Sequence, residues 1–159
     1  MRSKLHLTLC LALLLCSTAV TWARPAAPAS APQGQPSAQE SLYKRLGGYD
    51  ALAAVTDDFI TRLATDPKLG RFFVGHSTDS KIRIRQHIVD FLCVATGGPC
   101  KYTGRTMETA HTGLNITEED WTLSVQHLGE TLNKFKVPAK EQGEVVNAIV
   151  PLKSQIVGK

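Results

Sequence analysis

The chain has 159 residues, which is enough for one domain with some length to spare. It has 18 Lys and Arg and 14 Asp and Glu, which gives a formal net charge of +4. Without Arg2, Lys4, Arg24 and Glu40, residues 41–159 carry 15 basic and 13 acidic residues. This small excess, with no basic stripe that carries interleaved aromatic residues, argues against a nucleic-acid partner.

Residues 1–23 have the layout of a secretory signal peptide. Two basic residues precede an apolar run at 5–20, which is short for a resident membrane helix, and small residues follow as far as Ala23. We expect cleavage after Ala23, and therefore an exported protein, periplasmic or secreted, with no stable membrane insertion after cleavage. A lipoprotein anchor at Cys16 is disfavoured because Leu15 is a poor residue for that processing.

Residues 24–40 predict a disordered linker. They are rich in Pro, Ala and Ser and contain no large apolar side chain, so they cannot bury enough surface to fold. The folded domain is therefore expected over 41–159, which is sufficient for one core.

Two cysteines, Cys93 and Cys100, remain in the expected domain. An exported protein meets conditions in which disulfides persist, and the Gly97-Gly98 pair between the cysteines would let the chain double back. The alternative is a buried Cys93 that acts as a small hydrophobe and a free thiol at Cys100. The sequence leaves both open.

Helical periodicity runs through 41–159, and no strand-like alternation of useful length occurs, so we predict an all-α domain with four substantial helices and two short ones. In chain order we expect a short helix at 41–46, a helix from about 49 to 64, a tight passage at 69–73, a helix from Thr78 to Gly97, a short helical run before Gly113, a long helix after Thr117 and a last helix after Pro138.

Several residues mark where these helices begin and end. Thr78 and Asp79 are candidate N-caps. Thr117 and Asp120 have the spacing of a capping box. Pro151 predicts a kink or an early end in the last helix.

Four histidines fall in the domain, and two of them lie on apolar helix faces. His87 shares its face with Ile84 and Phe91, and His111 is four residues after Met107. His76 is expected in an exposed turn, and His127 is expected to be a partly buried structural residue. A lone histidine on an apolar face is usually a core residue, but two on neighbouring helices favour a shared metal centre. A single iron in an apolar slot is what a heme pocket requires.

Four segments carry a family resemblance. In order over 41–157, LYKRLGGYDAL, LGRFF, ATGGPCKYTGR and METAHTGLNIT resemble the group I truncated hemoglobins, the bacterial-type two-over-two globins. The resemblance implies a two-over-two helical sandwich around heme b (iron protoporphyrin IX).

The resemblance also implies where the heme binds. His111 matches the proximal iron ligand, and Phe73 matches the residue that packs on the heme plane. Phe59 and Phe72 lie beside Phe73, while Met107 and Ile116 match the proximal wall and Tyr102 lies near the heme edge. Arg105 could pair with a heme propionate through two hydrogen bonds, or it could be a solvated loop charge.

The distal side departs from the family pattern. Ile60 stands where many relatives have a tyrosine, and Ile84 and Ile88 replace glutamines. Loss of those donors removes roughly 1–3 kcal/mol of stabilisation from bound oxygen. His87 matches a position from which some relatives supply a second axial ligand, so we expect His111 and His87 to ligate the iron together. The alternative is that His87 donates to a bound gas directly or through water.

The sequence thus predicts an exported heme b protein that binds the diatomic gases O2, NO and CO, with His87 as a gating ligand and no catalytic residue. One alternative is a heme redox enzyme such as an NO dioxygenase or peroxidase. Because no flavin or nicotinamide motif is present, such chemistry would need an electron-donor protein. Two others are a bis-histidyl electron-transfer protein and a heme-free helical interaction module.

Overall fold

The structure, a computed structural model, describes residues 40–159. The predicted signal peptide at 1–23 lies outside the described residues, and so does the predicted linker at 24–40 except for Glu40.

Every regular element of residues 40–159 is helical. The four longer helices are α2 (Gly48–Thr65), α3 (Thr78–Ala95), α5 (Glu118–Lys134) and α6 (Ala139–Ile149). The short ones are α1 (Leu42–Arg45), α4 (Met107–His111) and two 3-10 segments, η1 (Leu69–Phe73) and η2 (Val150–Gln155). The all-α prediction is confirmed. None of these helices is long and apolar enough to cross a membrane.

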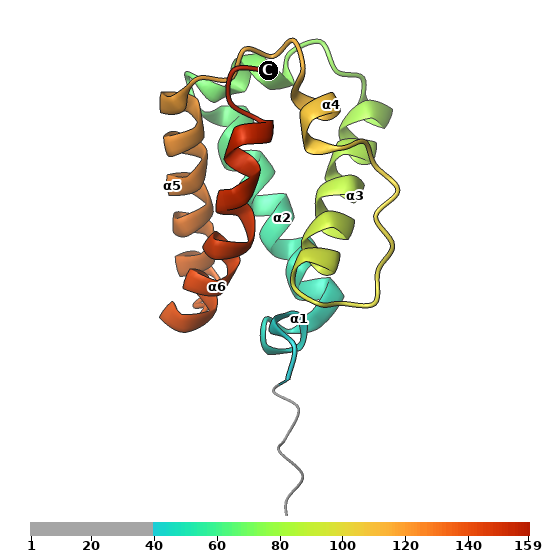
Figure 1. The fold of residues 1–159 in the computed structure, drawn as a ribbon, viewed down its shortest axis with the longest axis vertical. Coiled ribbons are helices and arrows are strands. Elements are labelled where there is room, and N and C mark those ends of the chain that lie inside the picture. The colour runs from blue at the N-terminus through green and yellow to red at the C-terminus, as the bar shows by residue number, and fades with distance from the viewer. Residues whose placement is uncertain (1–39) are drawn as a thin grey trace, which may run out of the picture. The chain divides into compact units, whose positions relative to one another are not determined.

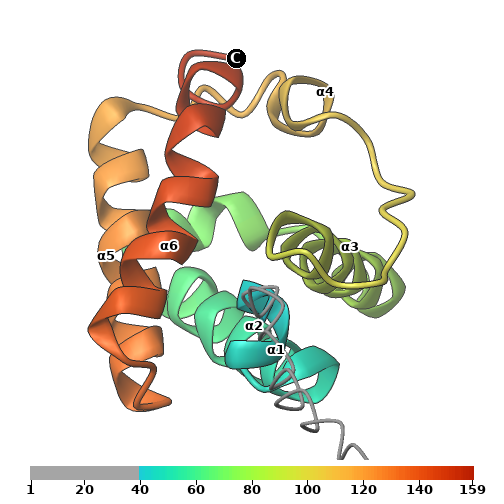
Figure 2. The same ribbon diagram turned by 60° about the horizontal axis from the view of Figure 1, so that its bottom comes forward.

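The longer helices form two pairs. In Figure 1, α5 and α6 run side by side, and α2 lies between them and α3. Figure 2 shows α2 and α3 together in one layer and α5 and α6 in the other. This is the two-over-two sandwich that the family resemblance implies. The short helix α4 is separated from α3 by the irregular segment 96–106, and Figure 2 shows α4 lying apart from α3.

Side-chain caps fix most of the helix starts. Thr117 caps α5, and its hydroxyl and Asp120 form the predicted capping box. The prediction that Thr78 or Asp79 caps α3 is wrong, since Ser77 is the N-cap and accepts from the backbone N–H three residues on, at 3.2 Å. The cause is backbone conformation: Ser77 is extended, with ψ at 162°, while Thr78 is already helical.

Prolines shape the last helix. Pro138 is the N-cap of α6, where its missing N–H costs nothing. As Pro151 predicts, the α-helix ends at Ile149, and the chain continues as the 3-10 segment η2. The residues of η2 then lie against α4.

The apolar core lies on both sides of α2. One cluster joins α2 to α5 and α6, and its buried members are Val55, Leu128, Leu132 and Val145. The other joins α2 to α3 through Leu52, Leu92 and Cys93. Because both clusters use α2, this helix holds α3 in place relative to α5 and α6.

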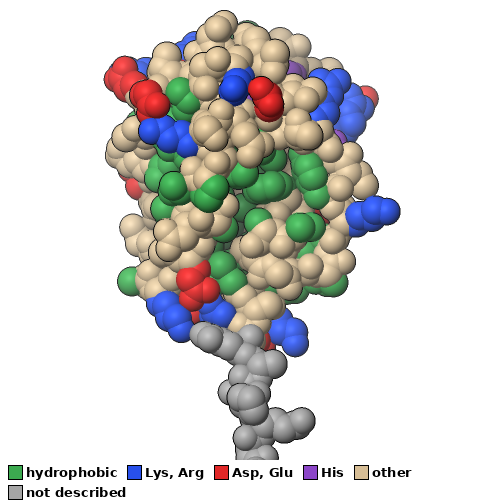
Figure 3. All heavy atoms as spheres, viewed as in Figure 1, with side chains coloured by type: hydrophobic (Ala, Val, Ile, Leu, Met, Phe, Trp, Pro, Cys, Tyr) green, Lys and Arg blue, Asp and Glu red, His purple; other side chains and the backbone are tan. Residues whose placement is uncertain are grey.

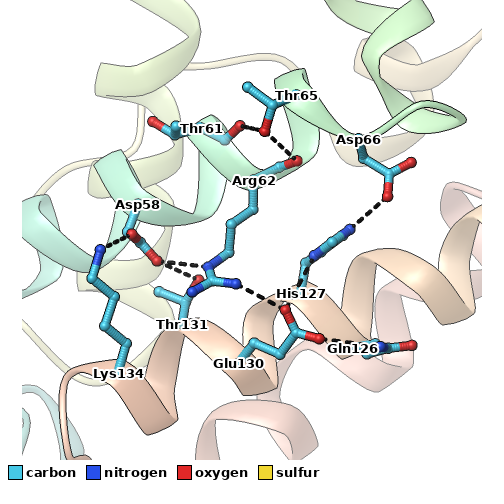
Figure 4. A network of polar contacts seen from close by, with 10 residues as sticks. All are labelled: Asp58, Thr61, Arg62, Thr65, Asp66, Gln126, His127, Glu130, Thr131 and Lys134. Atoms are coloured by element: carbon cyan, nitrogen blue, oxygen red, sulfur yellow. Dashed lines mark hydrogen bonds and ion pairs between the residues drawn. The ribbon is translucent and has the colours of Figure 1, made fainter.

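A polar network also clamps α2 against α5 (Figure 4). The Asp58 carboxylate accepts hydrogen bonds from Arg62 Nε at 2.8 Å, from Thr131 Oγ1 at 3.1 Å and from Lys134 Nζ. These donors, Lys134 first, hold the pKa of Asp58 at about 2, below its ordinary value of 3.8. The clamp therefore depends on an ionised Asp58.

His127 belongs to the same network and has a structural role, as predicted. Its Nε2 lies 2.9 Å from Asp66 Oδ2. The other oxygen of Asp66 accepts the backbone N–H groups of Lys68 at 2.7 Å and Leu69 at 3.0 Å. The bond from Leu69, and then that from His127, lowers the pKa of Asp66 to about 2. Asp66 and His127 thus fix the start of η1, which carries two of the predicted heme contacts. His76 is exposed, as expected.

Candidate heme site

His111, the predicted proximal ligand, ends the five-residue helix α4. Thr106 caps that helix by accepting the N–H of Thr109 at 3.2 Å, and His111 is its last residue. His111 Nδ1 lies 2.7 Å from the carbonyl oxygen of Met107. A carbonyl can only accept, so Nδ1 carries the proton and Nε2 keeps its lone pair. This is the tautomer and the fixed ring orientation that a metal-ligating histidine needs.

Helix α4 contributes no buried residue, so other contacts must hold it. The last residues of the chain provide them. The N–H of Asn115 donates to the backbone oxygen of Lys159 at 3.0 Å, and the N–H of Gly158 donates to the carbonyl oxygen of Ile116 at 2.9 Å. Lys159 Nζ also lies 3.5 Å from Glu108 Oε1. We call residues 156–159 the C-terminal strap. The sequence did not predict this strap, because hydrogen bonds between the backbones of distant residues leave no pattern in the amino-acid sequence.

The residues predicted to form the distal wall lie on α3 and α2. Ile84, His87 and Ile88 on α3 are partly buried, and so is Ile60 on α2. His87 Nδ1 is buried without a hydrogen-bond partner. His111 and His127 differ, because each engages one ring nitrogen with an oxygen atom, although Nδ1 of His127 is likewise buried without a hydrogen-bond partner. An imidazole held on an apolar wall with no partner is the feature of this site that packing alone does not explain.

Aromatic residues from η1 and α2 complete the site. Phe72 and Phe73 are partly buried, and Phe59 packs beside the α2–α5–α6 cluster. The Arg71 guanidinium carbon lies 4.3 Å from the centre of the Phe72 ring, and its Nη2 lies 2.7 Å from Asp120 Oδ2. The capping carboxylate of α5 thus also orients η1, a support that sequence reasoning missed.

The predicted site residues fit a flat apolar cofactor. All of them are partly buried except Arg105, which is exposed as either interpretation of it requires. Figure 3 shows hydrophobic side chains gathered around a hollow in the middle of the face between α6 and α3. In residues 40–159, no three or more His, Cys, Asp or Glu side chains are grouped so that they could hold a metal ion. Iron here would need its own ligand set, as in a porphyrin, and His111 and His87 are the side chains predicted to hold it.

Residues 41–157 match the family model described as bacterial-like globin. The chain belongs to that family. A group 1 truncated hemoglobin of Mycolicibacterium paratuberculosis is 36% identical to this globin over 116 residues, which are 73% of the chain and 83% of the relative. One from Nostoc commune is 34% identical over 119 residues, 75% of the chain and 98% of the relative.

Solved structures agree. The Fe(III) form of truncated hemoglobin from Tetrahymena pyriformis has a TM-score of 0.69 and 28% identity, covering 76% of this chain and all (100%) of that one. The cyanomet 2/2 hemoglobin of a Synechococcus species, with covalently attached heme, has a TM-score of 0.68 and 27% identity, covering 75% and 99%. This globin is thus a group 1 truncated hemoglobin in family and fold, its cofactor is heme b, and its ligands are small diatomic gases.

The two cysteines that the sequence leaves open form a disulfide in this globin. The Cα atoms of Cys93 and Cys100 are 5.8 Å apart, and the sulfur atoms are bonded. Cys93 is fully buried, whereas Cys100 is partly exposed. Gly98 makes the tight return possible, because a Cβ there would lie 2.6 Å from Cys93 Sγ and from Tyr43 Cδ2.

The segment after the disulfide places Tyr102 against the distal helix of the globin, which the sequence did not predict. The Tyr102 ring meets His87 edge-on, with ring centres 6.1 Å apart, and Phe91 in the same way at 5.6 Å. Its hydroxyl donates to the carbonyl oxygen of Arg105 at 2.6 Å. Burial raises the pKa of Tyr102, so this phenol stays protonated. The place of Tyr102 at the heme edge stays a prediction, as does the role of the Arg105 side chain.

Proposed function

We propose that this globin is exported and that it binds its gas at a heme iron held by His111, with His87 in the sixth coordination position until a gas arrives. O2, NO and CO are the proposed ligands. Heme b supplies the iron that takes the gas and that can change its charge by one electron. The residues of the chain decide how easily a gas can bind to that iron.

The unpartnered imidazole of His87 carries this proposal. A structural histidine normally has a hydrogen-bond partner, because leaving a buried nitrogen unsatisfied costs roughly 1–3 kcal/mol. His127 is held by Asp66 through Nε2, although its Nδ1 is also buried and unpartnered, whereas no hydrogen bond holds Nδ1 of His87. A nitrogen ligand to iron gives the ring of His87 the directional contact that the protein does not provide.

The apolar wall around His87 sets the second part of the proposal. Ile60, Ile84 and Ile88 offer no hydrogen-bond donor, so a bound gas gains no polar contact from them. His87 would have to release the iron before a gas could bind, and its imidazole is the one side chain among these four that could then donate to the gas. One side chain would therefore set both the opening rate and the polar stabilisation of the ligand.

Export is supported by two features. The first 23 residues have the pattern of a signal peptide, and Cys93 and Cys100 are bonded in a way that persists in oxidising compartments. We further propose an electron-donor partner, since the sequence contains no flavin or nicotinamide motif. Expression of the full chain, followed by fractionation and N-terminal sequencing of the mature form, tests export, and a mature chain that begins at Arg24 is the expected result.

The ligand proposal is tested by the absorption spectra of ferric and ferrous protein. The wild type is expected to give a six-coordinate low-spin spectrum and His87→Leu a five-coordinate one. Gln86→Leu, the neighbouring position on α3, is the matched control and should keep the wild-type spectrum. An unchanged spectrum in His87→Leu would remove the ligand role. His111→Ala should lose the Soret band. A six-coordinate ferrous wild type that binds no CO would favour an electron-transfer protein over a gas-binding one.

A further inference from the structure

We propose that the Cys93–Cys100 disulfide, acting through Tyr102, positions His87, so that reduction of the disulfide by a dithiol opens the sixth position of the heme. This inference rests on the proposed ligation by His87. It makes Tyr102 a positioning residue and the disulfide a redox switch on gas binding.

The first step is the covalent tie between α3 and the segment that follows it. Cys93 lies in the last turn of α3, fully buried in the cluster with Leu52 and Leu92. Cys100 packs against the same cluster, and Tyr102 is only two residues further along the chain. The disulfide therefore anchors the start of segment 100–106 to the helix that carries His87.

The second step is the contact between the anchored segment and the ligand. His87 and Phe91 are four residues apart on α3, and the Tyr102 ring meets both edge-on. Because His87 Nδ1 has no hydrogen-bond partner, neighbouring side chains must limit rotation of the imidazole. Tyr102 is one wall of that enclosure. With the wall in place, fewer ring orientations compete with the ligating one, which is preorganisation.

Tyr102 is bound closely to its own segment. Its hydroxyl donates to the carbonyl oxygen of Arg105, and a Cβ on Gly104 would lie only 2.4 Å from that hydroxyl. The segment thus wraps closely around the ring. If Cys100 is released from Cys93, the wrapped segment can shift away from α3 as a unit, and Tyr102 then leaves His87.

The redox step balances with a dithiol as reductant. Cys100 is the accessible sulfur, since Cys93 is fully buried. One thiolate of the dithiol attacks Cys100 Sγ, the bond to Cys93 breaks, and Cys93 leaves as a thiolate that takes up a proton. The second thiol of the reductant then attacks the mixed disulfide and releases Cys100. Two electrons and two protons pass to the protein, and the reductant becomes a disulfide.

The experiment compares six-coordinate fractions in the ferrous holoprotein, where a dithiol cannot reduce the iron further. Cys100→Ser, Tyr102→Leu and wild type treated with dithiothreitol should each shift the equilibrium towards the five-coordinate form by about two- to tenfold, the size of one aromatic edge contact. Tyr102→Phe keeps the aromatic ring and should therefore retain the six-coordinate fraction of the wild type. In a His87→Leu background, the Cys100→Ser change should have no effect. Circular dichroism checks that each variant is folded. If Cys100→Ser does not fold, wild type reduced with dithiothreitol provides the same test of an opened disulfide.

The possible failures are distinguishable. If His87→Leu opens the site but neither reduction nor Tyr102→Leu changes the six-coordinate fraction, the switch is refuted while the ligand role of His87 stands. If His87→Leu leaves the spectrum unchanged, both are refuted. A shift that persists in the His87→Leu background would show that the disulfide acts on the heme without His87, and it would also overturn the proposal.

Discussion

Deletion of Gly158 and Lys159 should loosen the proximal side of the heme without disturbing the core. The deletion removes two backbone hydrogen bonds of 2.9 and 3.0 Å and the ion pair of 3.5 Å between Lys159 and Glu108. At about 1 kcal/mol for each hydrogen bond and 0–1 kcal/mol for an exposed ion pair, the C-terminal strap loses about 2 kcal/mol or slightly more. Helix α4 buries no residue of its own, and the two backbone bonds hold the segment that follows it, so most of this loss should appear as easier opening of α4 together with residues 112–117.

An opening equilibrium changed by about 2 kcal/mol corresponds to about 30-fold, so heme loss should be roughly 10- to 30-fold faster if α4 must open first. The assay is transfer of heme from the ferric protein to an excess of a high-affinity apoglobin, followed at the Soret band. Lys159→Ala is the matched control, because it keeps both backbone bonds and should change the rate by less than about threefold. Equal rates in wild type and deletion would refute the role of the strap, and equal rates in the deletion and Lys159→Ala would assign it to the ion pair.

Three further predictions concern stability and oxygen binding. Because the pKa of Asp58 is about 2 in the folded protein and 3.8 ordinarily, its contribution is complete above about pH 4 and is lost as the pH falls through 2. Urea titrations should therefore show about 1–2 kcal/mol of acid-labile stability that Asp58→Asn lacks. This value is discounted because Lys134 is exposed and solvent screens its attraction to Asp58. Gly98→Ala forces a Cβ to within 2.6 Å of Cys93 Sγ and should cost about 1–3 kcal/mol in the same titrations. In a His87→Leu background, Ile60→Tyr should slow oxygen dissociation roughly 5- to 100-fold by adding a donor, as measured by stopped-flow displacement.

Each of these has a clear contrary result. Identical pH profiles for wild type and Asp58→Asn would mean that the clamp between α2 and α5 is not electrostatic. Full stability in Gly98→Ala would mean that the turn beside the disulfide is looser than its contacts indicate. An unchanged oxygen dissociation rate in the Ile60→Tyr double variant would place Ile60 away from the bound gas.

The helices were predictable because their signals are local. Apolar residues at three- and four-residue steps, together with Thr117, Asp120 and Pro151, gave nearly the right element order and ends. The N-cap of α3 was missed for a physical reason: Ser77, Thr78 and Asp79 can all cap a helix, and only backbone conformation decides which of them does.

Candidate site residues could be chosen from the sequence where the proposed role depends on the residue's own helix face. His87 and His111 could be selected because each lies on an apolar stripe, and their environments support that choice. The contact of Tyr102 with His87 depends on how a loop returns to α3, and whether Cys93 and Cys100 bond depends on a distance. Neither leaves a pattern in sequence. Had the disulfide been assumed, the return of Tyr102 to α3 could have been inferred from its two-residue spacing from Cys100.

The most direct test of the gating role of His87 is the rate at which ferrous protein binds CO as the CO concentration rises. If His87 must leave first, the observed rate should level off at a value equal to its departure rate, whatever the gas concentration. In His87→Leu the rate should rise in proportion to CO, with no plateau. A wild type whose rate rises linearly over the whole range, as in the variant, would contradict the proposal that His87 closes the site.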